Sequence, residues 1–368
     1  MTQKVYRDLL EVMKSRKGPY AGLDIPEFFA LVEALFTPEE AEINNALPRK
    51  PATAAEIAQG TNKDEEEVAR ILEAMVDKGL CGMVTGPGQT LYQGLPFLPG
   101  IFEMVFIGGG ETVRLRRIAN LIHAYKTAFR AKEGVPQITY PFSRVIPVAR
   151  TIRADNVIHT YDQVMTYIDK YDSIGVGACY CRQAAKLRGE DNHGMPVDVC
   201  MFFGERVEKL AERLGIRRLT KQEAKEILDR CEEAGLIHMS RNTTEDIDFM
   251  CNCDRWHCEA VTNVLRQPKP GLVFNSGFQP VFDPERCAAC ETCIERCPPQ
   301  ALTMPFSSEP SPGGERGVVP QKDADLCFGC GVCATGCPEG AIEMEAKPGF
   351  PVPPRDLKEL VAALKAAR

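Results

Sequence analysis

Eight cysteines near the C-terminal end form two runs with the same spacing. In each run, two residues separate the first three cysteines, three residues separate the third from the fourth, and a proline follows. The first run is Cys287, Cys290, Cys293 and Cys297, and the second is Cys327, Cys330, Cys333 and Cys337. Cysteine thiolates hold iron-sulfur clusters, and this spacing is typical of proteins that bind [4Fe-4S] cubes. The pattern therefore predicts two such clusters.

The two runs belong to an internal duplication that exchanges one ligand. The second run lies 40 residues after the first, and the flanking Asp283 and Ala301 recur as Asp323 and Ala341. Three thiolates at three-residue steps can hold three irons of one cube, whereas the fourth lies too far along and reaches the neighbouring cube. We therefore expect these ligand sets: Cys287, Cys290, Cys293 and Cys337 for one cluster, and Cys327, Cys330, Cys333 and Cys297 for the other.

Zinc is the alternative metal, because CxxC pairs also bind zinc tetrahedrally. A zinc site gains nothing from a third cysteine at the same step, so the eight-cysteine pattern favours two cubes. Over residues 287–341 the chain resembles bacterial two-cluster ferredoxins, which implies transfer of single electrons at low potential. The connection from Leu302 to Gln321 is longer than in a minimal ferredoxin, and we expect it to form a surface loop.

A second group of cysteines lies upstream of the duplication. It consists of two Cys-x-Cys pairs and two single residues, namely Cys179, Cys181, Cys200, Cys251, Cys253 and Cys258. Each pair places two thiols on one turn or on one face of a strand, and the density of cysteines predicts a third iron-sulfur cluster. A cube needs four ligands, so one or two of the six would lie beside the cluster.

Other residues in this region have two possible roles. Arg182, which follows the first Cys-x-Cys pair, would either stabilise thiolates electrostatically or lie on the surface. His257 and His193 could replace a thiolate as ligand, although such histidines are more often solvated or hydrogen-bonded. The two remaining cysteines, Cys81 and Cys231, are expected to be buried, unreactive thiols.

Helix signals explain how distant cysteines could meet. A capping box at Thr220 to Glu223 begins a helix that we expect to end near Gly235, after an amphipathic helix at 204–214. This helical excursion would return the chain as a strand that carries Cys251 beside Cys181. Further helices are predicted at 111–133, 161–171 and 354–368.

The N-terminal third has the order of elements typical of a winged helix-turn-helix domain. Helix starts at Thr37 and Thr53 precede a helix from Asp64 to Gly79 and a hairpin with a Gly-Pro-Gly turn. From residue 53 to 92, seven acidic residues stand against three basic ones, so a phosphate backbone would be repelled. We therefore expect a protein-docking or structural role rather than DNA binding.

Composition excludes several classes of protein. The net charge of −7 and the pI near 5.5 argue against nucleic acid or anionic lipid as the main partner. The first 20 residues lack the apolar core of a signal peptide, and the most apolar window, Leu95 to Gly110, is too short and broken to cross a bilayer. We expect a cytoplasmic protein in which that window is core or, alternatively, a docking surface. Sixteen cysteines in a reducing compartment indicate metal ligands rather than disulfides.

Over nearly its full length the chain resembles an anaerobic family of 4Fe-4S dicluster-domain proteins. The resemblance rests on the winged-helix start, the Cys-Tyr-Cys-Arg segment at 179–182, the cysteine-rich segment and the ferredoxin pair. The cysteine-rich segment of that family is denser in cysteine than the segment in this chain. Here Asp254, Trp256 and His257 occupy part of it. We expect an α+β, multidomain fold with a winged-helix-like domain (1–105), an α/β middle domain with a cysteine-rich metal site (106–275), a two-cluster ferredoxin-like domain (276–350) and a C-terminal helix (351–368).

Three functions are compatible with these features. The first is an electron-transfer protein that links a low-potential donor to a partner redox enzyme and has no substrate chemistry of its own. The second is a reductase whose upstream cluster binds a substrate at an open iron. The third is a cluster-based redox sensor that acts on DNA through the winged helix, which the acidic helix disfavours.

Overall fold

The structure is a computed structural model that describes residues 2–86, 88–135, 137–153, 164–245, 247–305 and 318–367. The chain divides into two compact units. Residues 1–135, 177–193 and 206–217 form the first unit, and residues 136–176, 194–205 and 218–368 form the second. The border between the units falls within two strands, β4 (Ile174–Ala178) and β6 (Arg217–Leu219).

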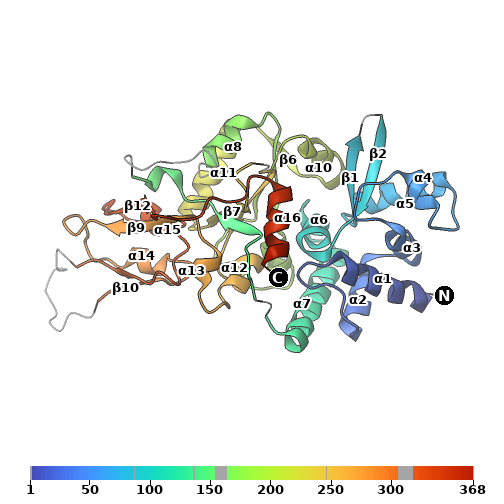
Figure 1. The fold of residues 1–368 in the computed structure, drawn as a ribbon, viewed down its shortest axis with the longest axis horizontal. Helices are drawn as coiled ribbons and strands as arrows, with labels where there is room; N and C mark the ends of the chain where they lie inside the picture. The colour runs from blue at the N-terminus through green and yellow to red at the C-terminus, as the bar shows by residue number, and fades with distance from the viewer. Residues whose placement is uncertain are drawn as a thin grey trace. The chain divides into compact units, whose positions relative to one another are not determined.

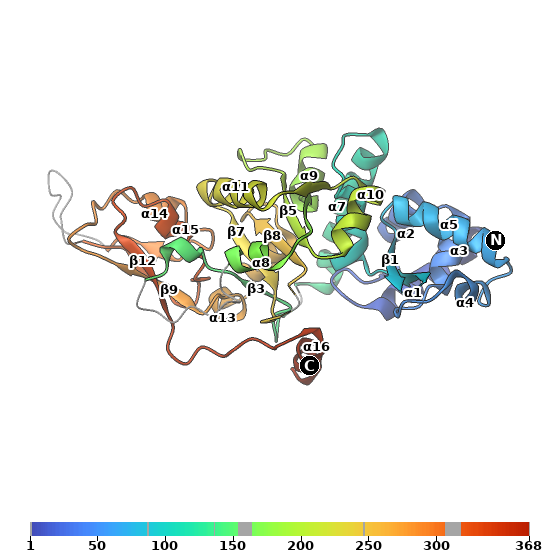
Figure 2. The same cartoon turned by 90° about the horizontal axis from the view of Figure 1, so that it is seen from above.

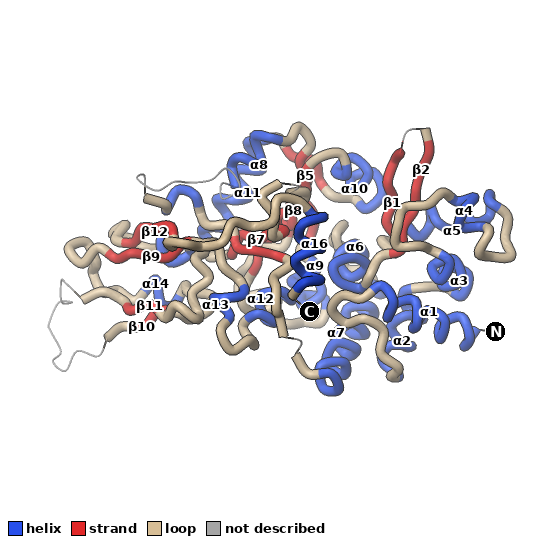
Figure 3. Tube along the Cα trace, viewed as in Figure 1, coloured by secondary structure: helices blue, strands red, loops and turns tan. Residues whose placement is uncertain are grey.

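Helices make up most of the first unit, apart from one hairpin (Figure 3). The helices are α1 (Thr2–Arg16), α2 (Pro26–Leu35), α3 (Pro38–Ala46), α4 (Ala54–Ala58), α5 (Glu65–Asp77), α6 (Phe102–Phe106), α7 (Val113–Glu133), α9 (Tyr180–Leu187) and α10 (Arg206–Leu214). The hairpin joins β1 (Cys81–Gly86) and β2 (Gln89–Gly94) as an antiparallel pair. An aromatic core holds these helices together, with Phe28, Phe97, Phe102 and Tyr125 fully buried.

The predicted helix starts of this unit are confirmed. Thr37 and Thr53 each form a complete capping box, in which the side chain accepts a hydrogen bond from the N3 backbone and the N3 glutamate bonds back. Asp64 caps α5 by accepting from the backbone N–H of Glu67. The buried face of α5 consists of Val68, Ile71, Leu72, Met75 and Val76.

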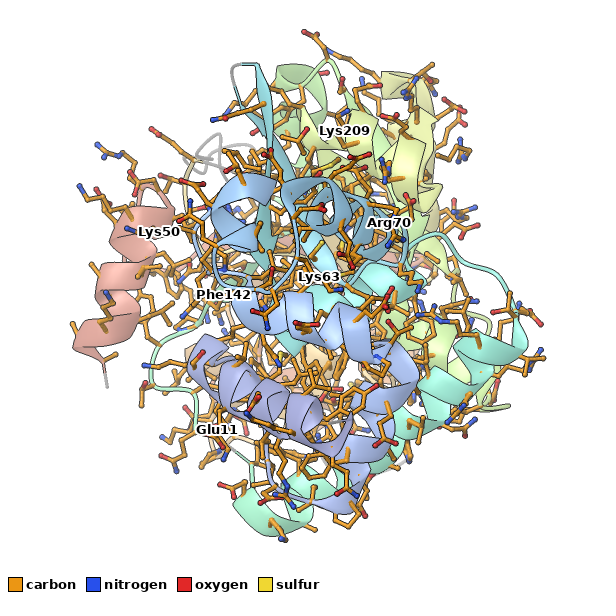
Figure 4. The ribbon with its side chains drawn as sticks, turned by 90° about the vertical axis from the view of Figure 1, so that its right-hand side faces the viewer. Glu11, Lys50, Lys63, Arg70, Phe142 and Lys209 are labelled. Atoms are coloured by element: carbon orange, nitrogen blue, oxygen red, sulfur yellow. The ribbon has the colours of Figure 1, made fainter. Side chains whose placement is uncertain are left out.

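Intramolecular contacts account for the acidic residues of α5. Glu65, Glu66 and Glu67 occupy its first turn, where the helix dipole favours negative charge. Nearer its end, Glu73 and Asp77 form ion pairs with Arg213 of α10, at 2.5 and 2.6 Å. The face drawn in Figure 4 carries two basic residues of this region, Lys63 and Arg70. The order of α4, α5 and the hairpin follows the expected one, while the winged-helix assignment itself stays a prediction.

The apolar window from Leu95 to Gly110 is core, as expected. Phe97, Ile101 and Phe106 have essentially no exposed surface, so burial rather than docking explains the apolar composition. None of the described helices combines the length and the hydrophobicity of a membrane span. The helix expected at 111–133 is confirmed as α7, which is capped by Thr112. Its first residue, Val113, is 85% exposed.

The second unit contains most of a six-stranded sheet with the order β3-β7-β8-β5-β4-β6. Four of its strands are β3 (Ser143–Val145), at one edge, and β7 (Ile237–Arg241), β8 (Phe249–Cys253) and β5 (Asp198–Phe203), which follow it in the sheet. They pair antiparallel, with Met239 opposite Cys251, Ile237 opposite Cys253 and Met201 opposite Met250. The strand expected around Cys251 is therefore confirmed as β8.

Helix α11 (Lys221–Glu233) packs against β5 and α8 (Val164–Lys170) (Figure 2). Its predicted capping box is confirmed, because Thr220 accepts from the backbone of Glu223 and the Glu223 carboxylate returns the bond. The remaining helices of this unit are α12 (Glu259–Val264), α13 (Pro270–Val273), α14 (Thr292–Glu295), α15 (Val332–Thr335) and α16 (Leu357–Ala366). The predicted helix at 161–171 is confirmed from residue 164, and its first three residues lie outside the described ranges.

Two short antiparallel sheets complete the second unit (Figure 1). One pairs β9 (Phe278–Phe282) with β12 (Ile342–Ala346), and the other pairs β10 (Leu302–Thr303) with β11 (Gln321–Lys322). The strand before each cysteine run thus pairs with the strand after the other run. The centre of the predicted surface loop between β10 and β11, residues 306–317, lies outside the described residues.

Candidate metal centres

The two cysteine runs adopt the same backbone conformation. The N–H of Cys287 donates to Asp283 O at 3.0 Å, and that of Cys327 donates to Asp323 O at 3.0 Å. Reciprocal backbone hydrogen bonds also join the two repeats. The Asp283 N–H donates to Ala341 O at 2.9 Å, and the Asp323 N–H donates to Ala301 O at 2.8 Å.

Left-handed residues occur at equivalent places in both runs. The first run has Ala289 (φ 51°) and Glu291 (φ 61°) there, whereas the second has Gly329 (φ 66°) and Gly331 (φ 82°). A non-glycine residue pays about 1–2 kcal/mol for this conformation. Successive backbone N–H groups in such turns form a concave nest for anions. This turn occurs in both runs, and in the first run it forms without glycine. Such recurrence of the turn fits a loop that surrounds a negatively charged group.

The first cavity lies between the two repeats. Its volume is about 350 Å³. Four cysteines line it: Cys287, Cys290, Cys293 and Cys337. Cys290 is exposed to solvent, and the carboxylate-bearing residues Glu291 and Glu339 share the lining. We call this the outer cavity.

The second cavity has about 310 Å³ and is lined by the other set of thiols. These are Cys297, Cys327, Cys330 and Cys333. All four are buried, and the rest of the wall is apolar or backbone, including Phe328 and Met344. We call this the inner cavity. The structure therefore brings together both groups of four cysteines that the spacing predicts.

The sulfur atoms differ in their surroundings. In the outer cavity, a hydrogen bond with the Thr292 hydroxyl lowers the pKa of Cys290, while burial raises the pKa of Cys293 to about 11. In the inner cavity, burial raises the pKa of Cys297 to about 11 and that of Cys330 further. Backbone N–H groups reach sulfur at both sites, for example from Ala301 to Cys297 at 3.2 Å and from Ala341 to Cys337 at 3.3 Å.

These features test whether the residues fit iron-sulfur clusters. Buried thiols with raised pKa values become thiolates only when a cation compensates their charge, as iron does. In the part of the chain that the structure describes, no three His, Cys, Asp or Glu side chains are placed to hold a single metal ion. Four thiols around each cavity and backbone N–H groups directed at sulfur are the features that such clusters need. The residues fit two cubes.

Four of the upstream cysteines belong to the second unit. Cys251 and Cys253 lie on β8, Cys200 lies on β5, and Cys258 immediately precedes α12. Hydrogen bonds with the thiols of Cys251 and Cys258, together with burial, raise the pKa of Cys253 well above its ordinary value. Cys253 is therefore in contact with two other predicted thiols, those of Cys251 and Cys258.

The other two upstream cysteines belong to the first unit. Cys179 precedes α9 and Cys181 lies in its first turn, so this Cys-x-Cys pair occupies one turn as expected. That Cys179 and Cys181 share a metal site with the cysteines of the second unit stays a prediction. Arg182 has no exposed surface, so the alternative of a surface arginine was wrong. The prediction that it stabilises thiolates stays open.

The remaining candidates are also placed. Nδ1 of His257 lies 3.5 Å from Asp254 Oδ2, and Nδ1 of His193 lies 3.4 Å from Asp191 Oδ2. Asp254 Oδ1 accepts backbone hydrogen bonds from residues 256, 257 and 258, which fixes the loop that replaces the denser cysteine segment. Cys81 and Cys231 are buried, as expected.

One hydrophobic core joins the inner cavity to the upstream thiols. Cys330 shares this core with Cys253 and Cys258. Within it the rings of Phe274 and Phe328 pack edge to face, with their centroids 5.2 Å apart. A further link is the side chain of Arg255, whose Nη1 donates to Cys297 O at 3.4 Å. The cysteine spacing gives no sign of this link, because neither the aromatic residues nor Arg255 belongs to a motif.

Comparison with known proteins bears on the duplicated region alone. Residues 286–341 match the family described as the 4Fe-4S dicluster domain. No curated protein matches the chain. The match covers both cysteine runs and indicates iron-sulfur electron transfer.

Proposed function

We propose that this protein carries single low-potential electrons between a donor and a partner redox enzyme through two [4Fe-4S] clusters. The cluster in the outer cavity would be held by Cys287, Cys290, Cys293 and Cys337, and the one in the inner cavity by Cys327, Cys330, Cys333 and Cys297. The single observation that carries the proposal is that each cavity is lined by three thiols of one run and one of the other. When bound, the clusters supply reversible one-electron chemistry.

The two cavities suggest a direction for the electrons. The exposed Cys290 gives a partner protein close access to the outer site, whereas the inner site is closed by buried residues. From the inner site, the core around Phe274 and Phe328 leads to the thiols of Cys253 and Cys258. Electrons would enter or leave at the outer cavity and reach the upstream thiols through the inner one.

The contacts of Cys253 with Cys251 and with Cys258 support a third cluster as the next redox centre. Cys200 or a cysteine of the first unit would supply the fourth ligand. Such a centre serves either as a further relay or, if one iron keeps an open position, as the site where a reductase would bind its substrate. The sensor alternative depends on the winged-helix assignment in the first unit, which stays a prediction.

Iron and sulfide analysis of protein purified without oxygen tests the proposal. We expect about eight irons and eight sulfides from the two cavities, and about twelve of each if the third cluster is present, by the stoichiometry of the cube. Cys253→Ser should remove the third paramagnetic signal and leave the other two. Colourless, iron-free protein would contradict the whole proposal, while eight irons that are unchanged by Cys253→Ser would remove the third cluster alone.

A further inference from the structure

Arg296 and Gly336 occupy equivalent places in the duplication, each directly before the fourth cysteine of its run. The fold brings these two positions together. A Cβ atom on Gly336 would lie 2.1 Å from Nε of Arg296 and 2.2 Å from its Cδ. The arginine side chain therefore crosses the second repeat where only glycine leaves room, at the residue that precedes Cys337 of the outer cavity.

Two hydrogen bonds fix the guanidinium in this position. Its Nη2 donates to Glu232 O at 2.9 Å and its Nη1 donates to Glu233 O at 3.1 Å. These carbonyls belong to the last turn of α11, where the helix dipole favours a cation. The contacts orient the charge and leave it positive, because backbone carbonyls carry no net charge.

The charge of Arg296 is not neutralised by a carboxylate. Among the described residues, none forms an ion pair with it, and its buried Nε–H has no hydrogen-bond acceptor. Burial lowers the pKa of Arg296, whereas the charge interaction with Cys333 of the inner cavity raises it. The structure thus places a half-buried, uncompensated cation beside thiols of the inner cavity and against the glycine that precedes an outer-cavity cysteine.

We propose that the guanidinium of Arg296 stabilises the reduced forms of both clusters and so raises their reduction potentials. The proposal rests on the proposed function. An arriving electron adds one negative charge to a cluster, and a fixed, half-buried cation nearby favours that state. Arg296 neither gains nor loses a proton in this step, and the electron comes from the donor and leaves to the acceptor. The effect should be larger at the inner site, because Arg296 adjoins Cys297 and interacts with Cys333.

Redox titration of the iron-loaded Arg296→Gln variant, followed by electron paramagnetic resonance, tests the proposal. We expect the equilibrium constant for reduction of the inner cluster to fall about tenfold, the low end of what one nearby opposite charge does to a charged group. For one electron this equals a shift of about 59 mV to lower potential. The outer cluster should shift in the same direction by less.

Arg286 provides a matched control. It directly precedes Cys287 in the outer cavity and donates from Nη2 to Glu339 O at 2.9 Å, but it is exposed to water. Arg286→Gln removes the same charge beside a cluster ligand, and solvent screening should keep its effect below that of Arg296→Gln. Equal shifts in the two variants would overturn the proposal.

Two further variants keep the test decisive if Arg296→Gln fails to hold about eight irons. Arg296→Lys retains the positive charge and should leave the potentials near those of the parent protein. Gly336→Ala keeps every charge but displaces the guanidinium, and its backbone (φ −96°) accepts alanine, so its potentials should fall. The reverse order of these two variants would overturn the proposal.

Unchanged potentials in an iron-loaded Arg296→Gln protein would refute this inference and leave the proposed function intact. Iron-free parent protein would refute both.

Discussion

The outer and inner cavities are built from the same repeat, yet they differ in their exposure to solvent. The outer cavity has an exposed cysteine and two glutamates in its wall, whereas the inner one has four buried cysteines and an apolar wall. The same backbone turns therefore serve two purposes. One site has a cysteine exposed to solvent, and the other is continuous with the hydrophobic core of the second unit. The difference shows that the surroundings, rather than the ligand spacing, set how exposed each site is.

The largest expected effect separates the two cavities by stability. Cys330→Ala should lose the inner cluster and lower the apparent free energy of unfolding by about 3 kcal/mol, comparable to a lost covalent cross-link, because the site is part of the core. Cys290→Ala should lose the outer cluster with a smaller loss of stability. Iron content and thermal unfolding of both variants measure this, and equal destabilisation would erase the distinction between the sites.

A second comparison exchanges the left-handed residues of the two runs. Gly329→Ala should destabilise the inner site, because the new Cβ would lie 2.2 Å from Phe278 O at a positive φ. Ala289→Gly should instead relieve strain in the outer loop and stabilise the protein by up to about 1 kcal/mol. Chemical denaturation of the iron-loaded variants checks both signs. Stabilisation by Gly329→Ala would show that the inner loop is not held as tightly as its contacts imply.

A third comparison uses access from solvent. The outer cluster should bleach about tenfold faster than the inner one on exposure to oxygen or a chelator, since losing the inner cluster requires local opening of the core. The two paramagnetic signals followed over time give the rates. Loss of both signals at one rate would mean that the cavities open together.

The smallest effect concerns the glutamates of the outer cavity. Neutralising Glu291 and Glu339 to glutamine removes negative charge near the outer site and should raise its potential slightly, with the increase shrinking as salt screens the exposed carboxylates. The inner potential should stay constant. Potentials measured at low and high ionic strength test this, and an equal rise at both sites would contradict the expected separation.

Much of the candidate site could be predicted because its geometry is local. The spacing of the two runs sufficed to pair Cys337 with the first run and Cys297 with the second, and capping boxes located the helices that begin after Thr37, Thr53 and Thr220. These features depend on contacts within a few residues or on a repeat that is visible in the sequence.

The rest depends on packing between segments far apart in the chain. Arg182 is buried although arginine is usually exposed, and Val113 is exposed although valine is usually buried. The side chain of Arg296 fills the space beside Gly336. The contact between Arg296 and α11 joins residues 64 positions apart, and no local pattern predicts which residue fills such a space.

The reciprocal pairing of the repeats limits how such a protein can be divided. Each cavity takes three thiols from one repeat and one from the other, and the first strand of the region pairs with the last. A single repeat in isolation can complete neither cavity, so it would need a second copy to supply the missing sulfur. Tethering two copies in one chain makes this encounter independent of protein concentration, and it lets one copy keep arginine at the place where the other must keep glycine.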